Sequence, residues 1–146
     1  MSSSDLARQV GLHLERWYQA LGRELGEITR PQRRLMRCIA EEDGLTVGRL
    51  AHRMGRGMAG ITRALDRLEA MRLLRRYREA GDDQRLVRLA LTDTGRAALS
   101  HADRLYTQRV NVSLEPLSLV EQRELLRLLE HVTLALREEP ESIDER

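Results

Sequence analysis

Two arginines spaced one helical turn apart, Arg63 and Arg67, have the most specific chemistry in this sequence. They lie in the segment 58–69, where apolar residues recur at helical spacing and predict a helix with one buried side. A guanidinium presents a planar fork of donors that matches phosphate oxygens and the edge of guanine. We therefore expect both arginines to contact nucleic acid, at phosphates more than at bases. The alternative is an ordinary solvated helix face.

Small residues share the polar side of this segment, and another arginine precedes it. Ala59 and Gly60 permit the close approach of a ligand, and Arg56, in the turn 55–57, can reach a phosphate. A short helix is expected over 47–54. This helix, the turn and the following segment make a helix-turn-helix, whose second helix is presented to the major groove of DNA.

Two short alternating segments, 75–79 and 86–91, follow and predict a β-hairpin with a polar tip. Arg85 at this tip is a candidate for the DNA minor groove, because a narrow groove concentrates negative potential. Asp83 is expected to orient Arg85 by a paired hydrogen bond. The alternative is an exposed ion pair that contributes little. Alternation places Arg76 on the face opposite its arginine neighbours, so at least one arginine of the first strand is structural.

Longer helices must position this unit. Apolar spacings of three and four predict a first helix over about 5–26, and a capping box at Thr29 and Gln32 starts a second. A long helix is expected over about 92–111, and a capping box at 118–121 opens the last one. A monomer has few places to bury the apolar sides of the first helix and the last two. Pairing with a second copy is therefore expected, which also suits a palindromic DNA site.

The predicted fold class is thus mainly α with a small β-hairpin wing: a winged helix-turn-helix with six helices that dimerises through its N- and C-terminal helices. The expected domains are an N-terminal dimerisation helix (1–28), a winged helix-turn-helix DNA-binding domain (29–96) and C-terminal dimerisation helices (97–146). Charge is segregated in the same way, since residues 30–96 hold 16 Arg against 9 acids and the remainder holds 9 Arg against 14 acids. No Lys occurs, so an arginine is weaker support for phosphate contact here than in an average composition.

The order of elements and several motifs resemble the MarR family of bacterial transcriptional regulators, over about residues 5–136. The resemblance is carried by Leu50-Ala51, Thr62-Arg63, Leu65-Asp66-Arg67-Leu68-Glu69, Asp83-Gln84-Arg85, and Leu91-Thr92 with Gly95-Arg96. The wing Asp-x-Arg followed by Leu-Thr-x-x-Gly is specific in combination. Three departures stand out: Gly57 takes the place of a capping Ser, Arg56 that of an apolar turn residue, and Arg72 that of the usual Gly after the recognition helix.

The resemblance implies a homodimer bound to a palindromic operator in double-stranded DNA, with each fourth helix in a major groove and each wing tip in a flanking minor groove. Thr62, within the family's motif, is expected to bind the DNA backbone. The resemblance also implies a repressor that leaves DNA when a small aromatic or phenolic effector binds between the dimer helices and the DNA-binding lobe. Trp17, His13 and Cys38 are candidates for this pocket. Core packing is the alternative for Trp17, and an inert thiol rather than a redox sensor is favoured for Cys38.

Other classes of function find little support. No nucleophile and base are paired by spacing, so an enzyme is not expected, and no cofactor is implied. The four histidines lack close ligand spacing, so no metal site is expected. A single Cys and the lack of a long apolar run favour a cytoplasmic protein without a membrane span. The main alternative to DNA binding is a winged-helix protein-interaction module whose arginine face binds an acidic partner.

Overall fold

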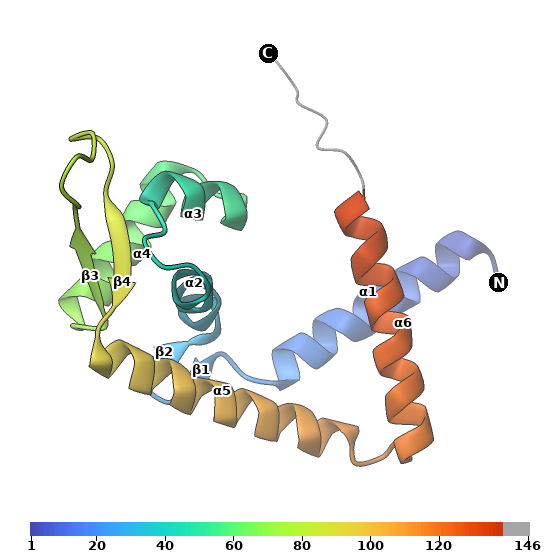
Figure 1. Ribbon diagram of the computed structural model, residues 1–146. Coiled ribbons are helices and arrows are strands. Elements are labelled where there is room, and N and C mark those ends of the chain that lie inside the picture. The colour runs from blue at the N-terminus through green and yellow to red at the C-terminus, as the bar shows by residue number, and fades with distance from the viewer. Residues whose placement is uncertain (139–146) are drawn as a thin grey trace. The chain divides into compact units, whose positions relative to one another are not determined.

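The computed structural model describes residues 1–138 of the chain (Figure 1). The chain divides into two compact units, Met1–Gln108 and Arg109–Arg146, and the division falls inside a helix. The elements in order are α1 (Ser3–Ala20), β1 (Glu24–Leu25), β2 (Ile28–Thr29), α2 (Arg30–Glu41), α3 (Val47–Met54), α4 (Met58–Ala70), β3 (Leu74–Tyr77), β4 (Arg88–Leu91), α5 (Asp93–Leu114) and α6 (Leu119–Glu138). Within the described residues these are six helices and a β-hairpin wing, which confirms the predicted winged helix-turn-helix fold. The expected dimerisation through the terminal helices stays a prediction. The expected functional boundaries at residues 28 and 96 stay a prediction.

The first helix is shorter than its apolar pattern indicates. It starts at a capping box formed by Ser2 and Asp5, and it ends at Ala20. The expected continuation to about residue 26 is wrong, because Leu25 and Ile28 turn into the core as the two arms of a small antiparallel ribbon. Gly26, at the start of the two-residue turn between them, has a φ of +69°, which favours glycine and suits a tight hairpin.

The second helix begins as its sequence predicts. Thr29 Oγ1 accepts the Gln32 backbone N–H, and the Gln32 side chain accepts the Thr29 N–H in return. This capping box satisfies two groups at the start of α2. Farther along, α2 buries Leu35, Met36 and Ile39 in the core of the first unit.

That core is one continuous cluster of buried side chains contributed by every element from β1 to the first half of α5. Representative members are Leu35 of α2, Leu50 of α3, Leu65 of α4, Leu89 of β4 and Ala102 of α5. Aliphatic side chains fill it, as expected from a sequence without Phe. The cluster fixes α3, α4 and the wing as parts of one body.

The turn between α3 and α4 is tight. Thr46 caps α3 by accepting the Arg49 N–H at 3.3 Å, and Gly55 ends that helix in the left-handed region at φ +60°. Gly57 precedes α4 with no side-chain cap, as its lack of a side chain requires. The helix-turn-helix expected over residues 47–70 is therefore present.

The end of α4 shows how an arginine replaces the usual glycine. Arg72 adopts φ +60°, and among the described residues it is the one non-glycine with a positive φ. The Arg72 N–H donates to Glu69 O at 2.9 Å, and the Leu73 N–H donates to Leu68 O at 3.0 Å. These two bonds close a left-handed helix end of the Schellman type. The departure at this position leaves the turn intact and places the strain on Arg72.

The wing is an antiparallel pair of four-residue strands, with Leu74 opposite Leu91 and Tyr77 opposite Arg88. Its root is joined to the segment before α3, because the Leu89 N–H donates to Leu45 O and the Val47 N–H donates to Val87 O. The strands are shorter than the expected 75–79 and 86–91. Residues 78–87 instead form a long loop at the tip.

The start of α5 explains the Leu-Thr-x-x-Gly motif. Leu91 is buried, and Thr92 Oγ1 donates to Arg72 O at 2.7 Å and accepts the Gly95 N–H at 3.0 Å. A Cβ on Gly95 would lie 1.9 Å from Leu73 O. The motif therefore supplies a core residue, a cap that also bridges two elements, and the glycine that lets α5 approach the backbone behind α4.

The second unit contains the end of α5 and the described part of α6. As predicted, α6 opens with a capping box, since the Ser118 N–H donates to Glu121 and the Glu121 N–H donates to Ser118 Oγ. The Gln122 side chain donates to the carbonyls of Leu114 and Leu117 and closes the connection between the helices. No helix in residues 1–138 combines the length and apolar character needed to cross a membrane.

Candidate nucleic-acid interface

The polar side of α4 is open to solvent over its whole length. Its opposite side buries Ile61, Leu65 and Leu68, and this fixes the rotation of the helix. The expected contact residues are then exposed or half-buried along one accessible side: Ala59, Gly60, Thr62, Arg63 and Arg67. The tertiary structure thus presents the predicted residues together.

Arg56 lies at the start of this side. It is exposed in the turn, and its backbone N–H donates to Ala51 O, which completes the end of α3. Its Nη2 lies 3.6 Å from the position that a Cβ on Gly60 would take. The guanidinium of Arg56 therefore lies over the first turn of α4, where the absence of a side chain on Gly60 leaves room for it.

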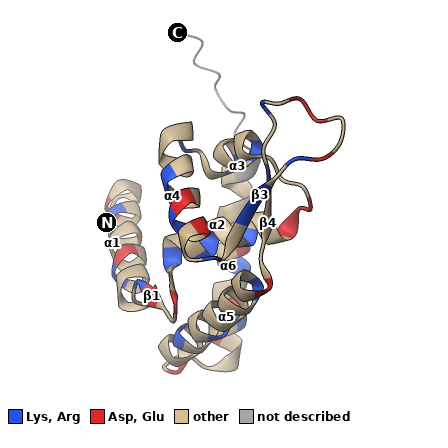
Figure 2. Cartoon of the chain, turned by 90° about the vertical axis from the view of Figure 1, so that its left-hand side faces the viewer, with Lys and Arg blue, Asp and Glu red and all other residues tan. Residues whose placement is uncertain are grey.

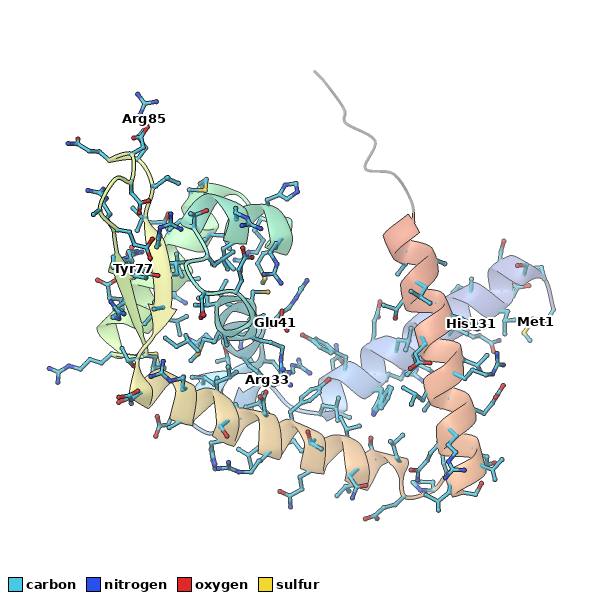
Figure 3. The ribbon with its side chains drawn as sticks, in the orientation of Figure 1. Met1, Arg33, Glu41, Tyr77, Arg85 and His131 are labelled. Atoms are coloured by element: carbon cyan, nitrogen blue, oxygen red, sulfur yellow. The ribbon has the colours of Figure 1, made fainter. Side chains whose placement is uncertain are left out.

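At the wing tip, Arg85 points outward from the molecule (Figure 3). The expected paired hydrogen bond between Asp83 and the Arg85 guanidinium is wrong. Asp83 Oδ1 instead accepts the Arg85 backbone N–H at 2.9 Å. Aspartate makes such local bonds readily in turns, so Asp83 shapes the turn and leaves the Arg85 guanidinium exposed.

The bidentate aspartate–arginine pair of the wing is a different one, between Asp82 and Arg88. Arg88 Nε and Nη2 each lie 2.8 Å from an oxygen of Asp82, and Arg88 Nη1 donates to Gly44 O at 3.0 Å. Hydrogen bonds from the Arg88 side chain and from the Glu79 N–H lower the pKa of Asp82 from 3.8 to about 2. Asp82 in turn raises the pKa of Arg88. Both residues were missed from sequence, where Asp83 and Arg85 matched the motif better.

Ion pairs divide the arginines of residues 30–96 into two groups. Those held by acids are Arg33 and Arg37 with Asp103, Arg49 and Arg53 with Glu42, Arg76 with Asp66 and Glu69, Arg88 with Asp82, and Arg96 with Asp93. The expected contact arginines Arg56, Arg63, Arg67 and Arg85 form no ion pair with any residue of 1–138. Arginines and acids alternate over α4 and the wing loop, whereas the charged residues of β3 are arginines only (Figure 2). Ion pairing therefore separates the free arginines from the bound ones better than their position in the sequence does.

Arg76 is the structural arginine that strand alternation predicts. It is half-buried, and it donates to Glu69 at 2.9 Å and to Asp66 at 2.8 Å on α4. It therefore joins the wing to α4. Arg75, its neighbour on the other face of β3, is exposed and lies 4.9 Å from the centre of the Tyr77 ring.

The three candidate effector residues lie apart from the hollows described in the first unit. His13 is exposed and Trp17 is half-buried on α1, which has no buried residue. Cys38 is half-buried on α2 and packs against the core, with its Sγ 3.8 Å from Met54 Sδ. One hollow of about 510 Å³ lies behind the wing beside Tyr77, and another of about 540 Å³ is lined by Thr62 and Arg85. Neither hollow is lined by His13, Trp17 or Cys38. Their role in effector binding stays a prediction.

The described residues contain no group of three or more His, Cys, Asp or Glu side chains placed to hold a metal ion.

Comparisons with known proteins agree with this geometry. Residues 28–87, from β2 to the wing loop, match the model of the MarR family. Residues 28–87 therefore carry a MarR-family domain. No curated protein sequence matches the chain.

Among solved structures, wild-type MarR from E. coli is 24% identical, with a TM-score of 0.74 over 87% of this chain and 96% of that one. The PcaV transcriptional regulator from Streptomyces coelicolor, in complex with its natural ligand, is 25% identical, with a TM-score of 0.64 over 93% and 94%. A protein from Pseudomonas aeruginosa described as a "probable transcriptional regulator" is 26% identical, with a TM-score of 0.71 over 87% and 98%. The chain thus shares its fold with proteins described as transcriptional regulators over most of its length.

Proposed function

We propose that this protein is a dimeric, sequence-specific DNA-binding regulator of the MarR type, and that it represses transcription until a small molecule releases it. The observation that carries the proposal is the arginine division: the arginines expected to contact DNA have no acidic partner among the described residues, whereas Arg53, Arg76 and Arg88 do. An unpaired, exposed guanidinium can neutralise a phosphate without first breaking an ion pair. The protein would act in the cytoplasm, where the chromosome of a bacterium lies.

In this proposal α4 enters the major groove. Its small residues Ala59 and Gly60 let the helix start approach the groove closely, and Thr62 donates to the DNA backbone. Arg63 and Arg67 follow on the same side and bind phosphates or guanine edges. Arg56, over the first turn, extends the phosphate contacts.

The wing supplies the second contact. Arg85 is exposed at the tip, and a narrow minor groove attracts a guanidinium because its negative potential is enhanced there. Asp83 holds the backbone at Arg85 in a turn. A major-groove helix and a minor-groove arginine then bind adjacent parts of one half-site.

Dimerisation is supported by apolar side chains that each unit leaves exposed. Leu6, Val10 and Leu14 repeat along α1, and each is about half exposed. On α6, Val132 and Leu136 are 60% and 70% exposed. Apolar rows of this kind are stabilised by pairing with a second copy, and a twofold dimer matches a palindromic operator.

Effector release is proposed by analogy with the relative PcaV, whose structure contains its natural ligand. We place a small aromatic or phenolic effector beside α1, where Trp17 and His13 lie, with Cys38 of α2 as a third candidate. Isothermal titration of the dimer with phenolic acids, repeated on the Trp17→Ala variant, tests this assignment. Equal heats for both proteins would remove Trp17 from the pocket.

DNA binding is tested by fluorescence anisotropy on a labelled duplex that carries the region upstream of the chain's own gene. We expect the logarithm of affinity to fall by about 0.9 per neutralised phosphate as the logarithm of salt concentration rises. Arg63→Ala and Arg85→Ala should each weaken binding by about tenfold to a hundredfold, the range for hydrogen bonds from charged groups.

Arg104→Ala is the matched control, because it removes the same charge from an exposed arginine that bonds to Ser100 on α5, away from the interface. Binding that is absent at low salt would contradict the proposal. Binding to an acidic protein but not to duplex DNA would favour the protein-interaction alternative. Sedimentation equilibrium showing a single chain at micromolar concentration would contradict the dimer.

A further inference from the structure

The tip of the wing is built from two successive turns, each closed by an aspartate. In the first, the Asp82 N–H donates to Glu79 O at 3.1 Å, and Asp82 Oδ2 accepts the Glu79 N–H at 2.8 Å. In the second, the Leu86 N–H donates to Asp83 O at 2.9 Å. Gly81, at φ +90°, is the third residue of the first turn. The tip therefore has a defined local shape, but its turns do not attach it to the rest of the protein.

Arg88 provides that attachment. Its guanidinium binds both oxygens of Asp82 on one side and the carbonyl of Gly44 on the other. The side chains of Asp82 and Arg88 are only 9% and 25% exposed, so this bidentate pair is far better shielded from water than a usual surface pair. A single side chain thus connects the wing tip with the turn between α2 and α3.

This connection affects the geometry of the proposed interface. Backbone hydrogen bonds join the wing to the segment before α3 at Leu45 and Val47, and on the wing side they end at Val87. Beyond that point the direction of the tip depends on side chains, and Arg85 lies three residues from each member of the Asp82–Arg88 pair. The Gly44 turn leads directly into α3, whose packing against α4 sets the position of the other contact surface.

We propose that Asp82 and Arg88 are positioning residues, which hold Arg85 at the place where it can bind DNA while α4 binds the same site. The inference rests on the proposed DNA-binding function. Arg88 acts through Arg85, because its own guanidinium is occupied by Asp82 and the Gly44 carbonyl. Neither Asp82 nor Arg88 belongs to the wing motif that carried the family resemblance.

A double-mutant cycle tests the proposal on a labelled duplex that the wild-type protein selects from a randomised pool. In the wild-type background, Arg85→Ala should weaken binding by about tenfold to a hundredfold. In the Arg88→Ala background the same change should weaken binding by less than about threefold, since coupled residues do not act additively. The slope of binding against salt should fall by the same amount in both single variants.

Two controls separate positioning from loss of fold. Arg63→Ala should weaken binding by the same factor in both backgrounds, because α4 does not depend on the wing tip for its place. Asp82→Asn keeps the shape of the side chain and leaves the Arg88–Gly44 bond available. In this background, as in Arg88→Ala, the Arg85→Ala change should weaken binding by less than about threefold. The far-UV circular dichroism spectrum should stay unchanged.

The failures are distinguishable. A pool from which the wild-type protein selects no duplex would overturn the proposed function, and this inference with it. A duplex that the wild-type protein binds, on which the Arg85 and Arg88 effects multiply independently, would overturn this inference alone. The inference would also be overturned if Arg88→Ala reduced the affinity losses caused by Arg63→Ala and by Arg85→Ala to the same extent. Arg88 would then contribute to general stability and not to the position of Arg85.

Discussion

Replacing Gly95 by alanine tests the packing that places α5 behind the recognition helix. The added Cβ would lie 1.9 Å from Leu73 O and 2.8 Å from Leu73 C, whereas ordinary contacts begin near 3.4 Å. Leu73 O belongs to the backbone and accepts the Thr92 N–H at 3.1 Å, so it cannot turn away as a flexible side chain would. The start of α5 must therefore move.

The magnitude follows from what that movement breaks. Overpacking a closed site costs about 1 to 3 kcal/mol. The displacement also strains the hydrogen bonds from Thr92 to Arg72 O and Leu73 O, each of which contributes about 1 kcal/mol. The better helix propensity of alanine offsets at most about 1 kcal/mol. We expect the free energy of unfolding to fall by about 3 kcal/mol.

Equilibrium unfolding in urea, followed by circular dichroism, measures this change. Gly48→Ala is the matched control, because Gly48 lies in α3 with no atom within 4 Å of an added Cβ. That variant should be as stable as wild type, or more stable by up to about 1 kcal/mol. If Gly95→Ala unfolds within 1 kcal/mol of wild type by this measurement, on the scale of a single hydrogen bond, the close approach of α5 to Leu73 is refuted.

Three further predictions concern local features. Arg72→Gly should raise the free energy of unfolding by about 0.5 to 1 kcal/mol, because glycine adopts the left-handed conformation without strain; a less stable variant in the same urea titration would contradict this. Asp82 should titrate near pH 2 by carbon-detected NMR. Since this pKa lies below the usual 3.8, its stabilising effect is present above about pH 4 and is lost as the pH falls toward 2, and it should be absent in Asp82→Asn; a titration at the usual value would disprove the pairing with Arg88. Thr46→Ala should lower the stability by about 1 kcal/mol through loss of the α3 cap, whereas Thr46→Ser should retain most of it; equal losses in both thermal melts would show that the hydroxyl is not the cause.

Much of the fold could be predicted from sequence because its signals are local. The capping boxes at Thr29 and Ser118 each lie within four residues, and the buried side of α4 follows from helical periodicity alone. The exception in this class is the β1–β2 ribbon. Its signal was one apolar residue on each side of Gly26 and Glu27, namely Leu25 and Ile28. The apolar periodicity that continues from α1 obscured this signal.

The candidate interface could be predicted only in part. Arg63 and Arg67 were found because their side of α4 is set by the buried residues of the same helix. The wing pair was assigned to Asp83 and Arg85, although the structure pairs Asp82 with Arg88. A motif gives spacing along the chain, but the choice between adjacent aspartates depends on how the loop folds back over the strand.

The sequence alone determined the six helices, the capping boxes of α2 and α6 and the charge available to residues 30–96. Only the tertiary structure decided which of those charges are free, because the partners lie on different elements: Arg33 of α2 binds Asp103 of α5, and Arg76 of β3 binds Asp66 and Glu69 of α4. Ion pairing depends on distances of a few ångströms, and those distances are fixed by packing of the common core.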